Sequence, residues 1–362
     1  MTNSDARIYS IERERAVRQP SAGRARCEAT TADGRPCRNY AVADGRCRVH
    51  ATTPDPADRA SAVTRAHPAW PAGGIDLVDG LREVLGEEWT DYVAQVAAFV
   101  RRRLTGDYSV DVFGFDVDLT EHVLVPLLRP FYRYYWRVRS VGHERIPPGG
   151  ALVVANHAGT VPVDALMVKL GLYDETGRHL RMLGADLLWR LPFAGELARK
   201  MGSTLACDED AEWLLLDDEL VGVWPEGFKG VGKLYKDRYK LQRFGRGGFV
   251  EVALRTQKPI VPTAVIGSEE IYPLIYNFRT LARLFGLPYF PITPTFPLFG
   301  PLGIIPLPSK WIIEYGEPID TREYGRDAAD DPMAIFDLTD RVRDLIQQML
   351  HRNLMGRRSV FF

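Results

Sequence analysis

The first regular hydrophobic pattern of the chain lies between Ile75 and Leu104. Its apolar residues recur at spacings of three and four, which is typical of one face of an amphipathic helix: Leu77, Leu81, Val84, Leu85, Trp89, Val93, Val96 and Val100. The predicted helix ends in residues 101–103, three arginines whose charges suit a helix C-terminus. We interpret them as the solvated basic end of an ordinary packed helix, with contact to anionic lipid headgroups as the alternative.

A second apolar stretch, residues 123–138, mixes aromatic side chains with arginines. Tyrosine and tryptophan tolerate a boundary between water and an apolar phase, and arginine can reach lipid headgroups from such a position. This composition favours a helix at a membrane surface, although a helix packed on a protein core would have the same pattern.

From residue 151 onward, short apolar runs alternate with helical spacing. Three runs are typical of buried strands: 151–155, 220–224 and 260–266. Helices are predicted between and after them, at 164–170, 209–216 and 334–350. Strands separated by helices predict an α/β fold with a mostly parallel sheet flanked by helices, in which functional residues gather at the carboxyl ends of the strands.

Residues 284–309 contain no charged residue, and this length would suit a membrane-spanning helix. The segment has seven prolines, however, and each removes a backbone donor and interrupts a regular helix. A bilayer cannot satisfy the carbonyl groups left unpaired, so a transmembrane helix is excluded here. Two interpretations stay open: an apolar lip that touches lipid, and a buried proline-rich loop.

The overall composition agrees with a globular protein, since the 362 residues are 46% hydrophobic and 26% charged. The formal net charge is −1, so the chain has no general attraction for nucleic acid, and no nucleic-acid partner is expected. The N-terminus is polar and rich in arginine and lacks the apolar core of a signal peptide. We therefore expect a cytoplasmic protein.

Two polar residues that can carry chemistry follow the first predicted strand, in the stretch ANHAGTVPVD. His157 leaves a buried strand and is placed to act as a general base near neutral pH. Asp164 begins the next predicted helix and can hold the second ring nitrogen of the histidine, as a carboxylate does in nucleophile-activating triads. The same spacing also fits a lone histidine beside a helix-capping aspartate, and spacing alone favours that simpler interpretation.

The second predicted strand is followed by the turn PEGFKG, which brings an acid and a base together at Glu226 and Lys229. Cations interleaved with aromatic residues continue from it: Lys229, Lys233, Tyr235, Lys236, Arg238, Tyr239, Lys240, Arg243, Phe244 and Arg246. Such a run can bind a phosphate, or the phosphates of a nucleotide-bearing thioester. A solvated basic face is the alternative.

The polar N-terminal region has the spacing C-x9-C-x9-C-x2-H, formed by Cys27, Cys37, Cys47 and His50. Three thiolates and an imidazole make a complete tetrahedral ligand set for a structural zinc ion, without which so polar a segment would not fold. The stretch resembles a small Cys3His module of various bacterial proteins; three unrelated thiols are the alternative. We interpret Cys207 as a small buried thiol rather than a nucleophile, because no histidine lies near it in the sequence.

The order of an NH…D stretch, a PEG turn and a later VP pair resembles the glycerolipid acyltransferases of the lysophosphatidic acid acyltransferase type, over residues 130–320. The resemblance implies that His157 takes a proton from an acceptor hydroxyl, which attacks an acyl thioester, and that Asp164 orients His157. It also implies substrate contacts by five residues: Asn156, Glu226, Gly227, Lys229 and Pro262. Direct attack needs no enzyme nucleophile, which agrees with the absence of a G-x-S-x-G motif.

The sequence departs from the usual pattern of that family in three places. Six residues separate His157 from Asp164 instead of the usual four, which resembles a subgroup with the form NH-x-G-x-x-P-x-D. Residues 202–208 contain no arginine where the family's second motif offers one for a phosphate. Lys229 replaces the more common arginine of the third motif, and a lysine lacks the bidentate fork. The resemblance therefore implies the reaction type and leaves a phosphate on the acceptor open.

The resemblance implies an O-acyltransferase that moves a fatty acyl group from acyl-CoA or acyl-carrier protein to a lysophospholipid or related glycerolipid, without a redox cofactor. A thioester hydrolase and a non-catalytic lipid-binding scaffold are the alternatives. The expected organisation is a polar tail at 1–66 with the zinc module at about 26–51, a helical membrane-surface segment at 67–140, an acyltransferase domain at 141–350 and a tail at 351–362. The expected location is the cytoplasm, at the inner face of the plasma membrane.

Overall fold

The computed structural model of the protein describes residues 88–361, except for 159, 192 and 246. The zinc module predicted at Cys27, Cys37, Cys47 and His50 lies outside the described residues, as does the beginning of the first amphipathic helix. The described part of that helix is α5 (Glu88–Thr105), which confirms the helical prediction from Glu88 onward. Among the described residues, no helix combines the length and the apolar character that crossing a bilayer requires.

The basic end of α5 is ion-paired within the protein. Arg102 lies 2.5 Å from Asp118, and Arg103 lies 2.6 Å from Asp116, whose carboxylate is almost completely buried. Pairing with these carboxylates holds the two cations in place and leaves them only partly exposed. They are therefore not a freely solvated helix end, and contact of this end with lipid headgroups stays a prediction.

The aromatic stretch after α5 is helical, with alternating α and π turns around its prolines. It consists of α6 (Val117–Leu119), the π turn η1 (Thr120–Leu124), α7 (Val125–Pro130) and the π turn η2 (Phe131–Tyr135). Prolines lack a backbone donor and interrupt the regular hydrogen bonding of an α-helix, and π turns are short departures from that bonding within a helix. Tyr132 and Trp136 are buried, whereas Leu127 and Tyr134 are 62% and 78% exposed. The segment thus packs one side on the protein and presents apolar side chains on the other.

Seven of the described strands form one sheet with the order β1-β9-β6-β2-β5-β3-β4. The strands are β1 (Arg139–Val141), β2 (Ala151–Ala155), β3 (Leu180–Gly184), β4 (Thr204–Leu205), β5 (Leu220–Val223), β6 (Ile260–Ile266) and β9 (Ile312–Tyr315). All neighbours are parallel except β6 and β9. The mostly parallel sheet predicted from the sequence is therefore confirmed.

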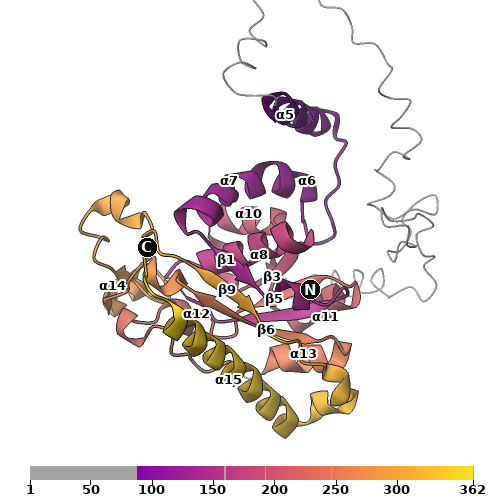
Figure 1. Cartoon of the computed structure of the whole chain (residues 1–362), viewed down its shortest axis with the longest axis vertical. Helices are drawn as coiled ribbons and strands as arrows, with labels where there is room; N and C mark the ends of the chain where they lie inside the picture. Colours follow the sequence, from indigo (N-terminus) through magenta and orange to yellow (C-terminus); the bar gives the residue numbers. More distant parts are fainter. Residues whose placement is uncertain (1–87, 159, 192, 246, 362) are drawn as a thin grey trace, which may run out of the picture. The chain divides into compact units, whose positions relative to one another are not determined.

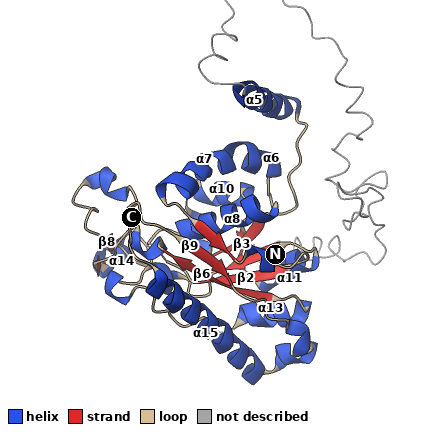
Figure 2. Cartoon of the chain, viewed as in Figure 1, coloured by secondary structure: helices blue, strands red, loops and turns tan. Residues whose placement is uncertain are grey.

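Helices cover both faces of this sheet (Figures 1 and 2). Alternate residues of β2 point to opposite sides: Leu152 and Val154 join one apolar core, and Val153 and Ala155 join the other. The first core is completed by α11 (Asp208–Leu216), α13 (Gly248–Thr256) and α15 (Pro332–Gly356), and the second by α7, η2 and α8 (Val163–Thr176). Because β2 is buried on both faces, it reads in the sequence as an uninterrupted apolar run.

Shorter helices and turns complete the described part: η3 (His143–Arg145), α9 (Asp186–Arg190), α10 (Ala194–Lys200), α12 (Phe228–Val231), η4 (Tyr235–Asp237), η5 (Ser268–Glu270), η7 (Thr321–Glu323) and η8 (Arg326–Asp330). The C-terminal helix α15 begins at Pro332, after Asp331 accepts the main-chain N–H of Met333. It continues past Leu350 to Gly356, so it is longer than the helix predicted at 334–350.

The chain makes a long excursion between β6 and β9, and we call its residues 271–308 the apolar lip. It contains β7 (Tyr276–Asn277), α14 (Arg279–Leu284), β8 (Pro291–Ile292) and the 3-10 turn η6 (Gly300–Ile304). In Figure 1 it is the orange segment around α14, beyond one end of the sheet. The interpretation as a buried proline-rich loop is wrong, because Leu298 is 78% exposed and Leu302 is 70% exposed.

Candidate active site

The register of the sheet brings the NH…D stretch and the PEG turn to one edge. Val154 of β2 lies opposite Val223, the last residue of β5. Both strands run in the same direction, so the segments that follow them emerge side by side at the carboxyl edge of the sheet. As a result the main-chain N–H of His157 reaches the carboxylate of Glu226, at 2.9 Å.

His157 and Asp164 are in direct contact despite the longer loop between them. Nδ1 of His157 lies 2.8 Å from Oδ2 of Asp164. The Asp164 carboxylate is completely buried, and it also accepts the main-chain N–H groups of Ala158 and Ala165 at 3.0 and 2.9 Å. Three donors converging on one carboxylate fix its position. The contact expected from the sequence is present, and Asp164 is more than a helix cap.

The loop that separates these residues is held by the apolar lip. Thr160 has a positive φ of 65°, a conformation that costs energy in a threonine and needs support from its surroundings. Its hydroxyl donates to the main-chain oxygen of Tyr272 at 3.2 Å, and its own main-chain oxygen accepts the hydroxyl of Tyr289. Two tyrosines of the lip therefore shape the six-residue loop so that Asp164 returns to the histidine.

The Asp164 contact decides which nitrogen of His157 is free. An ionised carboxylate can only accept hydrogen bonds, so Nδ1 carries a proton and donates it, and Nε2 keeps its lone pair. The side chain of His157 is 14% exposed, so it is enclosed but still accessible. This arrangement matches the base and orienting carboxylate of a triad without its nucleophile.

Glu226 supports His157 from within the protein. Its side chain is 0% exposed, one oxygen accepts the His157 main-chain N–H, and the other accepts that of Gln242 at 2.7 Å. With both oxygens used and no exposed surface, the carboxylate has no face for a substrate. This differs from the substrate contact predicted for Glu226, because burial under the turn gives it a positioning role.

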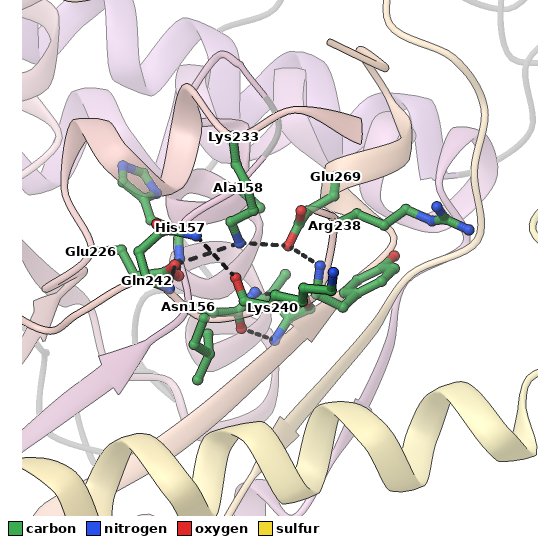
Figure 3. Close-up of polar contacts among 12 residues, drawn as sticks. Asn156, His157, Ala158, Glu226, Lys233, Arg238, Lys240, Gln242 and Glu269 are labelled. Carbon is green, nitrogen blue, oxygen red and sulfur yellow. Dashed lines mark hydrogen bonds and ion pairs between the residues drawn. The ribbon is translucent and has the colours of Figure 1, made fainter. Parts of the chain in front are cut away.

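A buried charge network continues from Glu226, as Figure 3 shows. The ammonium group of Lys233 lies 3.5 Å from Glu226 and 3.2 Å from Glu269, and the main-chain N–H of Tyr239 donates to Glu269 at 2.9 Å. The imidazole ring of His157 points away from this cluster, so the network holds the loop and leaves the ring free. One lysine between two carboxylates leaves one negative charge uncompensated, and burial raises the pKa of Glu269 to about 7.

This raised pKa predicts a particular dependence of stability on pH. The folded protein holds a proton on Glu269 between about pH 4.5 and pH 7, whereas the unfolded chain has lost it above its ordinary pKa of 4.5. The unfolded state then binds fewer protons, so the contribution of Glu269 to the free energy of unfolding falls as the pH rises through this window and is level above it. We expect the wild type to lose stability relative to Glu269→Gln between pH 4.5 and 7, as measured by urea unfolding.

The exposed Glu144→Gln variant is the control for this experiment, since its side chain is 65% exposed. The free energy of unfolding of this variant, plotted against pH, should run parallel to that of the wild type. Parallel curves for Glu269→Gln as well would show that Glu269 ionises in the folded protein as it does in the unfolded chain.

Two further residues predicted at the site have structural contacts instead. The buried Asn156 amide donates to the main-chain oxygen of Val265 and accepts the main-chain N–H of the same residue, at 3.0 and 2.7 Å. Pro262 lies inside β6, which continues to Ile266, and it pairs with Val154 of β2. It lines a hollow of about 480 Å³ together with Glu314 and residues of α15 rather than the edge at His157. Neither Asn156 nor Pro262 therefore presents a surface to a substrate beside His157.

The PEG turn presents Lys229 to solvent on α12. Gly227 has a φ of 52° that suits glycine, and it directs the chain from Glu226 into this helix. The basic run beyond it is mixed, since Lys229 is exposed whereas Lys233 is buried and paired, and Tyr239 and Phe244 belong to the core. The other described cations of the run are exposed, so it is not a uniformly solvated face and phosphate binding by the run stays a prediction.

Sequence reasoning missed two residues beside His157. The Trp224 ring lies 5.9 Å from the imidazole, and within the described part of the chain its buried indole N–H has no hydrogen-bond partner. A buried donor without a partner next to a base is a candidate for binding a substrate oxygen. A Cβ on Gly230 would lie 2.6 Å from the main-chain oxygen of His157, so this glycine allows α12 to pack against the loop. Tryptophan and glycine are common in cores and turns, so neither residue stands out in the sequence.

The stretch at 202–208 remains without an arginine, and Cys207 does not fit a nucleophile. Its thiol is half-buried, so the prediction of a small buried thiol is confirmed only in part. Burial raises the pKa of Cys207, which keeps the thiol protonated and unreactive. No group of three or more histidine, cysteine, aspartate and glutamate side chains among the described residues is arranged to hold a metal ion.

Comparison with known proteins places the chain in a family. A family model described as Acyltransferase matches residues 137–266, which include both the NH…D stretch and the PEG turn. An uncharacterized protein of Mycobacterium tuberculosis (strain ATCC 25618 / H37Rv) is 54% identical over 321 residues, covering 85% of this chain and 88% of that protein.

More distant similarities concern lipid enzymes. The protein named DGAT1/2-independent enzyme synthesizing storage lipids of Mus musculus is 24% identical over 160 residues, covering 43% of this chain and 48% of that protein. The crystal structure of the 1-acyl-sn-glycerophosphate (LPA) acyltransferase PlsC from Thermotoga maritima superposes with a TM-score of 0.44 and 17% identity, over 66% of this chain and 82% of that one. The chain belongs to one family with the mycobacterial protein, and it is an acyltransferase-family enzyme.

Proposed function

We propose that this enzyme transfers a fatty acyl group from an acyl thioester to the hydroxyl of a lysophospholipid or related glycerolipid at a membrane surface. The observation that carries the proposal is the 2.8 Å contact of His157 Nδ1 with the buried Asp164 carboxylate, which leaves Nε2 as a base. A scaffold without catalysis would not need this pair, so the contact argues against that alternative. The relative named as an enzyme synthesizing storage lipids supports a role in lipid synthesis.

The chemistry follows from the free lone pair on Nε2. His157 takes the proton of the acceptor hydroxyl while the hydroxyl oxygen attacks the carbonyl carbon of the thioester. A carbon–oxygen bond forms, the carbon–sulfur bond breaks, and the leaving thiolate takes the proton from the imidazolium. Asp164 stabilises that imidazolium through Nδ1. The indole N–H of Trp224 is a candidate donor to the oxygen on which negative charge develops.

The test is to incubate the purified full-length protein with labelled acyl-CoA and a mixed panel of lysophospholipids and diacylglycerols, and then to identify the labelled product. An acylated glycerolipid supports the proposal and names the acceptor. Release of free fatty acid with every acceptor would make the protein a thioester hydrolase and contradict the proposal. Repeating the assay with acyl-carrier protein distinguishes the two donors.

Lys229 gives a prediction about the acceptor, because it is the exposed cation of the PEG turn. If the acceptor bears a phosphate, Lys229→Ala should raise its KM by about tenfold or more, the usual effect of losing a hydrogen bond to a charged group. The value of kcat should stay unchanged, and Lys229→Arg should restore a low KM. Steady-state kinetics on phosphate-bearing and neutral acceptors check this, and an equal effect on both classes would contradict a phosphate contact.

A further inference from the structure

The apolar lip exposes large hydrophobic side chains over most of its length. Nine of them are more than half exposed, among them Leu284, Phe285, Leu298, Phe299, Leu302 and Ile304. A soluble protein rarely shows so many exposed apolar side chains in one segment unless the surface meets a partner or a membrane.

The charges of the lip indicate which partner it meets. Residues 271–308 contain Arg279 and Arg283, both exposed, and no aspartate or glutamate. Acidic residues make up a large share of this protein as a whole, with 47 in the full chain, so their absence from the lip is a local feature. An apolar surface with cations and no anions is complementary to a bilayer that contains anionic lipids.

The backbone of the lip also suits an apolar environment. Its prolines have no N–H group that would need a partner there. The N–H groups of Ile275 and Phe278 donate to the main-chain oxygens of Ile292 and Phe290, at 2.9 Å each. The N–H of Leu307 donates to the main-chain oxygen of Ile271, also at 2.9 Å. The seven prolines that exclude a spanning helix therefore make a fixed, extended lip cheaper to desolvate.

The lip lies against two other functional parts of the protein. Tyr272 and Tyr289 hold Thr160 in the loop between His157 and Asp164. The end of the lip accepts hydrogen bonds from η2 and from the residue that follows it. The hydroxyl of Tyr135 donates to the main-chain oxygen of Pro306 at 2.5 Å, and the indole of Trp136 donates to that of Leu307 at 3.1 Å. Where the two meet, Tyr134, Arg137, Pro308 and neighbours line an apolar hollow of about 350 Å³.

We propose that the lip is the membrane-docking surface of this enzyme: its apolar side chains enter the interface and its two arginines meet anionic headgroups. This inference rests on the proposed function at a membrane surface and adds the segment that makes the contact. Because the lip also shapes the His157 loop, docking places the site next to the bilayer, and a lipid acceptor can reach His157 without crossing water.

The test measures binding of the full-length protein to vesicles of phosphatidylcholine with phosphatidylglycerol, by flotation. Replacing two lip residues in Leu298→Glu/Phe299→Glu should weaken binding by at least about tenfold, because burying either side chain is favourable. Arg279→Glu/Arg283→Glu should weaken it by at least about tenfold on these vesicles, and much less on pure phosphatidylcholine. The control is Phe336→Glu, at a position on α15 that is 52% exposed, and it should bind like the wild type.

Two results would overturn the proposal. One is that both lip variants bind vesicles as tightly as the wild type. The other is that light scattering shows a dimer for the wild type and a monomer for the Leu298→Glu/Phe299→Glu variant, with no change in vesicle binding. The second result would make the lip an interface between two copies of the chain.

Turnover separates this proposal from the proposed function. With a short-chain lysolipid below its critical micelle concentration, the Leu298→Glu/Phe299→Glu variant should keep wild-type kcat, while its rate on vesicle-borne acceptor falls by about tenfold or more. A wild type that binds vesicles but acylates no acceptor would contradict the proposed function and leave the docking surface standing.

Discussion

A His157→Ala variant is expected to lose acyl transfer, with kcat reduced by roughly 10²–10⁴, the usual contribution of a general base. Without Nε2, the acceptor hydroxyl has to attack while still protonated, and the leaving thiolate has no acid beside it. The fold should survive, because the bond from residue 157 to Glu226 is made by its main-chain N–H and not by the imidazole. Product formation from labelled acyl-CoA and the identified acceptor gives the rate, and circular dichroism reports the fold.

The control is His351→Ala, since His351 lies on the exposed side of α15. It should keep wild-type kcat and KM. If His157→Ala showed near-normal kcat with the same acceptor, His157 would not be the base. An unchanged thermal unfolding midpoint in both variants would confirm that any loss of rate is chemical.

The strands and the catalytic pair could be predicted because local patterns determine them. The runs predicted at 151–155 and 260–266 are β2 and β6 without a shift, since strands buried on both faces appear as uninterrupted apolar segments. His157 then follows β2 directly, and the parallel sheet places it at the edge where the PEG turn also arrives. The contact with Asp164 was expected from the resemblance, and the six-residue loop closes because two tyrosines of the distant lip hold it.

The roles of Asn156 and Glu226 could not be predicted, because they depend on partners far away in the sequence. Asn156 bonds to Val265, 109 residues further on, and the His157 main chain meets Glu226 across 69 residues. A polar residue beside a catalytic histidine has the same appearance in a sequence whether it faces a substrate or supports a loop. Burial decides between the two, and burial is a property of the packed structure.

The buried pair of Lys233 and Glu269 was hidden for a similar reason. Lys233 looked like one cation in a basic run, yet it lies under the PEG turn while Lys229, four positions earlier, is exposed. In the lip, apolar residues that could have been buried are exposed instead. Their composition predicted contact with either lipid or the protein core. The exposure of Leu298 and Leu302 excludes the core.

An Asp164→Asn variant is expected to lower kcat by about 10³–10⁴ with little change in the KM of the thioester donor. The amide has the size of the carboxylate, but it is neutral and only one of its two ends can accept a hydrogen bond. Where its NH₂ group faces His157, the ring takes the tautomer with the proton on Nε2, which cannot act as a base. In the wild type the buried carboxylate also accepts two main-chain N–H groups, one on each oxygen, so one of these donors loses its acceptor in the variant. Steady-state kinetics with the acceptor identified above give both constants.

The tautomer of His157 separates this orienting role from a merely structural one. Nitrogen-15 NMR of the wild type should show a protonated Nδ1 and an unprotonated Nε2, and the Asp164→Asn variant should show the reverse. The matched control is Asp174→Asn on the same helix, which loses its 2.6 Å ion pair with Arg129 but should keep the rate and the tautomer. A normal kcat in Asp164→Asn would remove Asp164 from the mechanism. A reduced kcat with the wild-type tautomer would assign the effect to the lost stabilisation of the imidazolium, because a neutral amide at Nδ1 can still accept the ring proton but carries no negative charge.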